Sequence, residues 1–150
     1  DALLQAERAD RLLRLDGAEI ALIVGAALAY GIDALIVSNT TLDRPADLAS
    51  SHAGESGGLS GAPLRDRAAA ALNEAASAAA GRLPLIAVGG IGSGADAWAR
   101  IRAGASAVQI YSALIYEGPG LVGRIKRDLA LRLRAEGFAS VAEAAAAALR

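Results

Sequence analysis

The stretch LPLIAVGGIGSGADAWARIRAGASAVQIY, residues 83–111, decides the fold of this chain. It opens with a short, continuous apolar run at 83–88, which predicts a strand that is buried on both faces. A glycine-rich turn follows at 89–94, where Ser93 caps a predicted helix. A further apolar run at 107–111 predicts the next strand. A strand, a helix and a strand in this order imply a right-handed crossover between two parallel strands.

The same alternation of helices and strands extends in both directions from this stretch. The pattern predicts a strand at 34–37, helices at 1–16, 18–30, 64–80 and 119–136, and a short helix that opens at Ser140. A polar, glycine-rich connection at 39–63 is long, and connections of this length are usually functional or disordered. Three parallel strands form only a narrow open sheet, so the sequence predicts an incomplete α/β architecture.

The composition excludes several classes of function. The chain of 150 residues has 15 basic and 16 acidic side chains, and this balance does not favour a nucleic-acid partner. It has no cysteine, which excludes disulfides, thiolate metal ligands and cysteine nucleophiles, and we expect no metal site. The longest apolar run, 20–32, is too short to span a bilayer, and no signal-peptide pattern opens the chain. Asp1 is not a natural start, so we expect further residues upstream of it.

Two consecutive predicted strands end in loops that suit an anion. The turn at 89–94 places small residues where a strand meets the N-terminus of a helix, whose backbone N–H groups attract phosphate. After the next strand, Tyr111 and Ser112 open another helical stretch. Phosphate sites in the loops after the last two strands recur in (β/α)8 barrels, which would make the first predicted strand the sixth of such a barrel. The alternative is that the glycines only permit tight turns.

Polar residues also follow the first predicted strand, on the face where barrel enzymes place their chemistry. Residues 38–41 read Ser-Asn-Thr-Thr, and their hydroxyl and amide groups suit a ligand that carries amide and carboxylate groups. Capping of the strand end is the commoner use of such residues. The glycines of 57–61 allow the backbone to approach a flat or charged ligand, or they form an ordinary turn. We expect His52, the single histidine, to be a solvated loop residue without a partner.

Several of these segments, in this order, resemble the family of quinone-dependent (class 2) dihydroorotate dehydrogenases. The resemblance lies in 32–41 with the following Arg44 and Pro45, in 57–65, 88–91, 102–106 and 108–114, and in the pairs Gly118-Pro119 and Gly137-Phe138. It covers about residues 17–145. Because several linked motifs keep one order and spacing, the resemblance is far more specific than any one of them.

The resemblance implies a (β/α)8 TIM barrel of the FMN-linked type, of which this chain holds only about the last three βα units. Residues 17–150 would be the C-terminal part of the barrel, and 1–16 a shortened or rearranged helical lead-in. The implied activity is a flavoprotein oxidoreductase of pyrimidine biosynthesis, which oxidises dihydroorotate to orotate with FMN as cofactor and a quinone as electron acceptor. The implied location is peripheral, on the cytoplasmic side of the inner membrane, with the quinone reached through an N-terminal region outside this chain.

Carried over by position, the resemblance assigns the substrate to Asn39 and Thr40. It assigns the flavin to Ser38, Gly61, Gly90, Tyr111 and Ser112, with Ser60 and Gly89 adjacent. It places no catalytic residue in this chain, because the family's serine base belongs to a loop further upstream. A lysine that contacts the flavin in the family is also absent from 1–16, and Lys126 is the only lysine. We therefore expect the chain alone to be inactive.

Two alternatives remain open from the residues. One is a partial barrel that binds a phosphorylated ligand without catalysis, or that self-associates through its open sheet edges. The other is a different FMN or sugar-phosphate barrel enzyme. The motifs at 39–41 and 58–65 argue against the second alternative, since a phosphate site alone requires neither.

Overall fold

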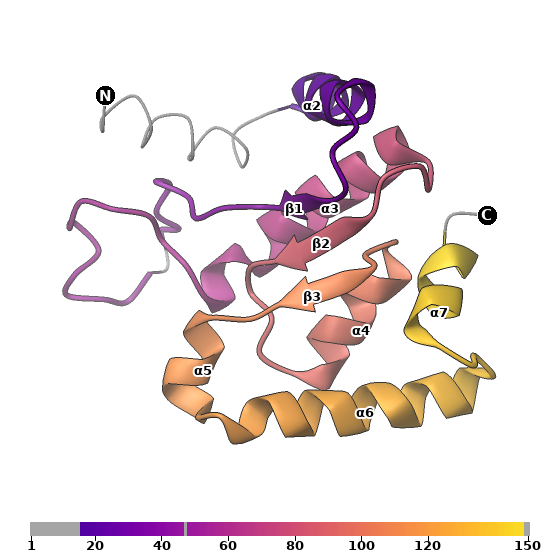
Figure 1. Ribbon diagram of the computed structural model, residues 1–150. Helices are drawn as coiled ribbons and strands as arrows, with labels where there is room; N and C mark the ends of the chain where they lie inside the picture. Colours follow the sequence, from indigo (N-terminus) through magenta and orange to yellow (C-terminus); the bar gives the residue numbers. More distant parts are fainter. Residues whose placement is uncertain (1–15, 47, 149–150) are drawn as a thin grey trace.

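The fold is described from a computed structural model, in which residues 16–46 and 48–148 are described. The elements in chain order are α2 (Gly17–Ala29), β1 (Leu35–Val37), the short 3-10 helix η2 (Ala62–Leu64), α3 (Arg65–Ala79), β2 (Leu85–Val88), α4 (Gly94–Arg102), β3 (Ala107–Gln109), α5 (Ser112–Glu117), α6 (Gly120–Glu136) and α7 (Val141–Ala147) (Figure 1). The helix predicted at 1–16 lies outside the described residues except for Asp16.

The three strands form one parallel sheet in the order β1-β2-β3. Leu35 pairs with Leu85 and Ile86 pairs with Ala107, and each pair of neighbouring strands is joined over three residues. All three arrows point the same way in Figure 1, toward the long connection at 39–61 and α5. The loops that follow the strands therefore meet at one edge of the sheet. This is the α/β arrangement that the sequence predicts.

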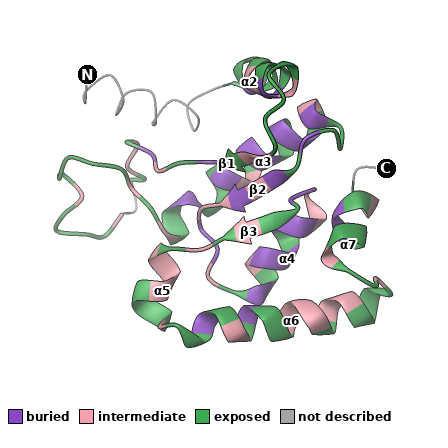
Figure 2. Cartoon of the chain, viewed as in Figure 1, coloured by how far each residue is buried: buried purple, intermediate pink, exposed green. Residues whose placement is uncertain are grey.

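The helices cover one face of this sheet. In the described part of the chain α3 packs against β1 and β2, α4 packs against β3, and α2, α6 and α7 pack on these helices. Leu85 and Ala87 of β2 point toward the helices and are buried. Side chains on the opposite face are more exposed, and Ile36 of β1 is 48% exposed. Strand β3 is likewise coloured largely as exposed in Figure 2. The continuous apolar run at 34–37, like that at 83–88, predicts a strand buried on both faces. For β1 this prediction is wrong, because the described helices cover only one face.

Side-chain caps fix where several helices begin. The Ser93 hydroxyl accepts the Asp96 N–H at the start of α4, and Ser140 caps α7 in the same way, as the sequence predicts. Helix α2 begins with a capping box between Asp16 and Glu19, which the sequence analysis did not predict. None of the helices within 16–46 and 48–148 combines the length and the apolar character that a membrane span requires.

Candidate functional site

A cavity of about 820 Å³ opens at the edge of the sheet where the strands end. Its lining comes from the loops after β1, β2 and β3 and from the segment that precedes α3. The cavity brings together all nine residues predicted for the site, namely Ser38, Asn39, Thr40, Ser60, Gly61, Gly89, Gly90, Tyr111 and Ser112. A cavity at the carboxyl ends of parallel strands is the usual place for a ligand in barrel folds.

The first group of lining residues follows β1. Ser38 is 7% exposed, and its hydroxyl oxygen is buried without a hydrogen-bond partner within the described structure. A buried hydroxyl without a partner is costly, and this one belongs to a residue that lines the cavity. The Asn39 side-chain oxygen accepts the Thr40 N–H at 2.8 Å, which is the local capping that the sequence left open. The amide of Asn39 still carries two N–H donors that can serve a ligand.

The chain returns to β1 at the far end of the long connection. Thr41 and Leu59 form an antiparallel bridge, with N···O distances of 3.1 and 2.6 Å. The bridge places Gly58 directly against the Thr40 side chain, where a Cβ atom on residue 58 would overlap the threonine hydroxyl. The glycine at position 58 therefore lets this segment close over Thr40, which is a stricter requirement than an ordinary turn.

A single arginine ties this long connection together. The Arg44 guanidinium donates to main-chain carbonyls on both sides of the connection, at 2.7 to 3.2 Å. Its acceptors are the carbonyl oxygens of Thr41, Leu42, Ala53, Glu55 and Gly57. The Thr41 carbonyl also accepts the Leu59 N–H of the bridge. The other four carbonyls lie outside the strands and helices, and the guanidinium pairs them in place of a regular element.

The turn after β2 can be built only with glycine at position 90. Gly90 has φ +69°, and a Cβ atom there would overlap the main chain of Arg65 at the start of α3. Gly94 is not among the glycines with positive φ, but a Cβ atom there would overlap the Asp128 side chain of α6, so this glycine serves the packing of α4 on α6 and not a turn. Gly90 therefore combines a turn conformation with a close approach of two main chains at the cavity wall.

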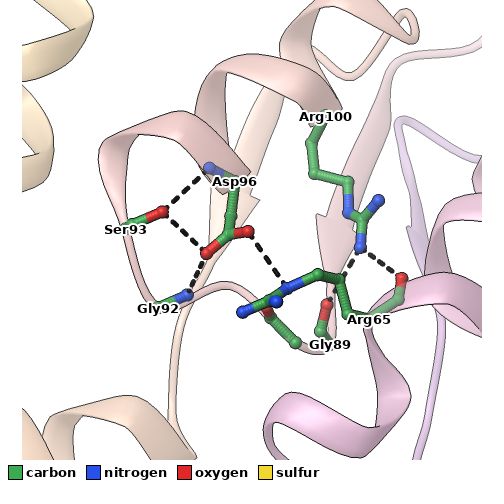
Figure 3. Close-up of polar contacts among 7 residues, drawn as sticks. Arg65, Gly89, Gly92, Ser93, Asp96 and Arg100 are labelled. Atoms are coloured by element: carbon green, nitrogen blue, oxygen red, sulfur yellow. Dashed lines mark hydrogen bonds and ion pairs between the residues drawn. The ribbon is translucent and has the colours of Figure 1, made fainter.

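An acidic side chain occupies the start of α4. The Asp96 carboxylate accepts the Gly92 N–H at 3.1 Å and the Ser93 hydroxyl at 2.8 Å, and it lies 3.1 Å from Arg65 Nε (Figure 3). The Ser93 hydroxyl in turn accepts the Asp96 N–H at 3.1 Å. The N-terminus of α4 is therefore less open to an anion than the sequence predicts, and the Gly89–Gly90 turn is the more accessible part of the loop.

Behind the glycine turn lies a buried arginine, Arg100, which is 5% exposed. One of its terminal nitrogens donates to the Arg65 carbonyl at 2.6 Å and to the Gly89 carbonyl at 3.4 Å (Figure 3). Its Nε has no partner within the described structure. Burial lowers the pKa of Arg100, and the nearby Asp96 carboxylate opposes that change. Arginine pKa values lie so far above neutrality that the group remains charged.

Sequence reasoning missed this arginine and its neighbours. A signal was present, because Asp96 and Arg100 are four residues apart on one predicted helix, a spacing that places both on the same face. It also missed the partner of His52, whose ring nitrogen lies 2.6 Å from the Glu55 carboxylate. That pair is exposed and does not line the cavity, so the prediction that His52 is a solvated loop residue is confirmed. The prediction that His52 has no partner is wrong.

The loop after β3 is joined to the segment before α3. The Ser112 hydroxyl donates to the Ser60 hydroxyl at 2.8 Å, which links two of the predicted contacts across the mouth of the cavity. The two lining carboxylates are both engaged with arginines, Asp96 with Arg65 and Glu117 with Arg124. The described lining can therefore bind and orient a ligand through hydroxyl and amide donors, main-chain amides and the Arg65 guanidinium. Within the described residues no cluster of side chains could hold a metal ion.

Comparisons with known proteins point to one family. The sequence profile of the family described as dihydroorotate dehydrogenase matches residues 15–133. The dihydroorotate dehydrogenase (quinone) of Rhodospirillum rubrum is 65% identical over 129 residues, which are 86% of this chain and 35% of the relative. The protein of the same name from Xanthobacter autotrophicus is 58% identical over 130 residues, 87% of this chain and 36% of the relative.

Solved structures give the same result. The crystal structure of DHODH from Eimeria tenella in complex with ferulenol superposes with a TM-score of 0.84 at 42% sequence identity, over 88% of this chain and 35% of that one. The ligand-free structure from the same organism gives a TM-score of 0.83 at the same identity. This chain thus spans about a third of the length of the proteins it matches.

Proposed function

The chain belongs to the dihydroorotate dehydrogenase family, and from that premise we propose that it supplies flavin-phosphate and substrate contacts of the enzyme. The reaction is the FMN-dependent oxidation of dihydroorotate to orotate in pyrimidine biosynthesis, with a quinone as electron acceptor. One observation carries the proposal: nine residues from four separate segments line a single cavity where the strands end. A partial (β/α)8 barrel places its ligand there.

The residues present fit a flavin that carries a phosphate. The buried, unpartnered Ser38 hydroxyl requires a polar partner that the described protein does not offer. Glycine at position 90 lets the main chain of this turn approach that of Arg65 at the cavity wall. Ser38, Gly61, Gly90, Tyr111 and Ser112 would hold the FMN, and the flavin when bound supplies the hydride chemistry.

The substrate would lie against the loop after β1. Dihydroorotate carries ring amides and a carboxylate, and Asn39 and Thr40 offer donors to both kinds of group. Gly58 holds the Thr40 side chain in place from the other side. These residues orient the substrate and leave its oxidation to the cofactor.

Proton removal is assigned to a residue outside the described lining. The carboxylates of Asp96 and Glu117 are held by arginines, and neither is poised to accept a proton. General-base catalysis requires a group within hydrogen-bond reach of the proton it removes. We also assign the quinone site to parts of the enzyme outside the described residues. A peripheral position on the inner membrane would likewise be a property of the whole enzyme.

The experiment is a titration of FMN with residues 1–150, followed by flavin fluorescence. We expect saturable quenching, and we expect orotate to change the absorbance spectrum of the bound flavin. Circular dichroism shows whether the chain is folded under the same conditions. A folded chain that leaves the fluorescence of FMN unchanged would contradict the proposal.

A further inference from the structure

We propose that Arg100 is a positioning residue for the phosphate of the flavin, acting through the Gly89–Gly90 turn without touching the ligand. The inference rests on the proposed function, because it assumes that this turn receives the phosphate. Arg100 does not line the cavity, whereas Gly89 and Gly90 both do. It therefore lies behind the wall that the ligand would meet.

The first argument is the direction of one peptide unit. In a trans peptide the C=O and the following N–H point in opposite directions, and the Gly89–Gly90 bond is not among the cis bonds of the described chain. Arg100 draws the Gly89 carbonyl away from the cavity. The Gly90 N–H of the same peptide unit therefore points toward the cavity, where it can donate to a phosphate oxygen.

The second argument is that Arg100 also fixes the support of this turn. Its shorter bond, 2.6 Å, holds the carbonyl of Arg65. The main chain of Arg65 is the surface against which Gly90 packs, and the Arg65 side chain donates to the Gly90 carbonyl at 3.3 Å. Releasing Arg100 would free the Gly89 carbonyl and the support of Gly90 together.

The third argument is charge. Arg65 and Arg100 carry two positive charges beside the turn, and the carboxylates of Asp96 and Asp66 lie close enough to act on Arg100. These charges balance, so the attraction for a phosphate depends on the place of Arg100 directly behind the Gly89–Gly90 turn and not on a net positive charge. Because Arg100 is buried, its field is weakly screened by water. A buried guanidinium with an unpartnered Nε is costly to the fold, and attraction of an anion offers a reason for keeping it.

The test compares two ligands that differ only in the phosphate, namely FMN and riboflavin. Dissociation constants are measured by fluorescence quenching for residues 1–150 and for the variants Arg100→Met and Arg100→Lys. We expect Arg100→Met to weaken FMN binding by about tenfold, because the Gly90 N–H is no longer held toward the phosphate, and to leave riboflavin binding nearly unchanged. Arg100→Lys, which keeps the charge and a donor, should restore most of the preference for FMN.

A matched control lies two residues further along α4. Arg102 donates to the Ala144 carbonyl at 3.1 Å and faces α7, away from the cavity. Arg102→Met therefore removes an arginine–carbonyl bond of the same helix, and it should leave the ratio of the two dissociation constants unchanged. If Arg100→Met does not fold, NMR of the unmodified chain decides: FMN should shift the Gly90 amide resonance strongly, and riboflavin should not.

The outcomes separate the two proposals. Equal weakening of FMN and riboflavin by Arg100→Met would overturn the inference and leave the proposed function intact, because Arg100 would then only support the fold. A Gly90 amide that does not respond to FMN while FMN binds would overturn it as well. An unmodified, folded chain that binds neither flavin would contradict the proposed function itself, and the inference with it.

Discussion

Gly90 shows how a single residue shapes the site. Alanine at this position would need a left-handed backbone and would also overlap the main chain of Arg65. We expect Gly90→Ala to abolish the quenching of FMN fluorescence. Gly31 is the control, because it has a similar φ of +66° but open space around it. Gly31→Ala should cost about 1 kcal/mol of stability from backbone strain and leave quenching unchanged. Unchanged quenching in Gly90→Ala would favour an ordinary turn.

Ser38 gives a prediction in which stability and binding change in opposite directions. Its hydroxyl is buried without a partner, so Ser38→Ala should leave the chain equally stable or more stable in chemical denaturation. The affinity for FMN should fall about 2- to 10-fold, since one hydrogen bond is lost.

Thr41 is the matched control for Ser38. Its hydroxyl is also buried, but it accepts the Asp43 N–H at 3.2 Å and a contact from Arg67 at 3.3 Å. Thr41→Val should therefore destabilise the chain by about 1 kcal/mol. Equal losses of stability in Ser38→Ala and Thr41→Val would refute the assignment of Ser38 to a ligand.

Some of these residues could be predicted from the sequence and others could not. The glycines and the polar residues at 38–40 stand directly after apolar runs, so their place at the strand ends follows from the pattern. The roles of Arg44 and Arg100 depend on main-chain carbonyls that lie far away in the sequence or on another element. Periodicity carries no information on such contacts, since any residue supplies a carbonyl.

The connection between β1 and η2 is the element that depends most on one side chain. Lysine at position 44 would keep the charge but has three donors on one nitrogen, in place of a fork that reaches five carbonyls. We expect Arg44→Lys to speed proteolytic cleavage within 48–57 several-fold, because the segment opens more often. The measurement is limited proteolysis with mass spectrometry of the fragments.

The control for this element is Arg82, which donates to two carbonyls at the end of α3. Arg82→Lys should leave cleavage within 48–57 unchanged. If Arg44→Lys is cleaved at the rate of the unmodified chain, the connection is held by its Thr41–Leu59 bridge and Arg44 is not required.

At this scale the sequence predicted the helices well and the strand lengths less well. Helices α4 and α7 begin at their predicted serine caps, because capping is a local property. The strand predicted at 107–111 ends at Gln109, where its pairing with β2 ends. Strand length depends on the partner strand, which the local pattern does not contain. The prediction that residues 17–150 form the C-terminal part of a barrel stays a prediction.

The whole molecule presents one face of its sheet and two sheet edges without a covering layer among the described residues (Figure 2). Unpaired strand edges and an exposed apolar side chain such as Ile36 favour association. We expect residues 1–150 to associate with rising concentration in sedimentation velocity, and Ile36→Thr to reduce that association. A single monomeric species across the concentration range would contradict this expectation.

Catalysis is also a property of the whole molecule. Residues 1–150 mixed with FMN should not oxidise dihydroorotate faster than free flavin does, because no lining carboxylate is available as a base. The assay is dihydroorotate-dependent reduction of a dye. Turnover above the free-flavin background would show that this chain holds a base that the described cavity does not reveal.

The central claim is that the cavity after the three strands receives both the flavin phosphate and the pyrimidine. A crystal structure of residues 1–150 with FMN and orotate tests it most directly. We expect the phosphate beside the main chain of Gly90 and near Ser112, a flavin contact with the Ser38 hydroxyl, and orotate against Asn39 and Thr40. Flavin bound elsewhere on the molecule, or a cavity that stays empty at saturating FMN, would contradict the claim.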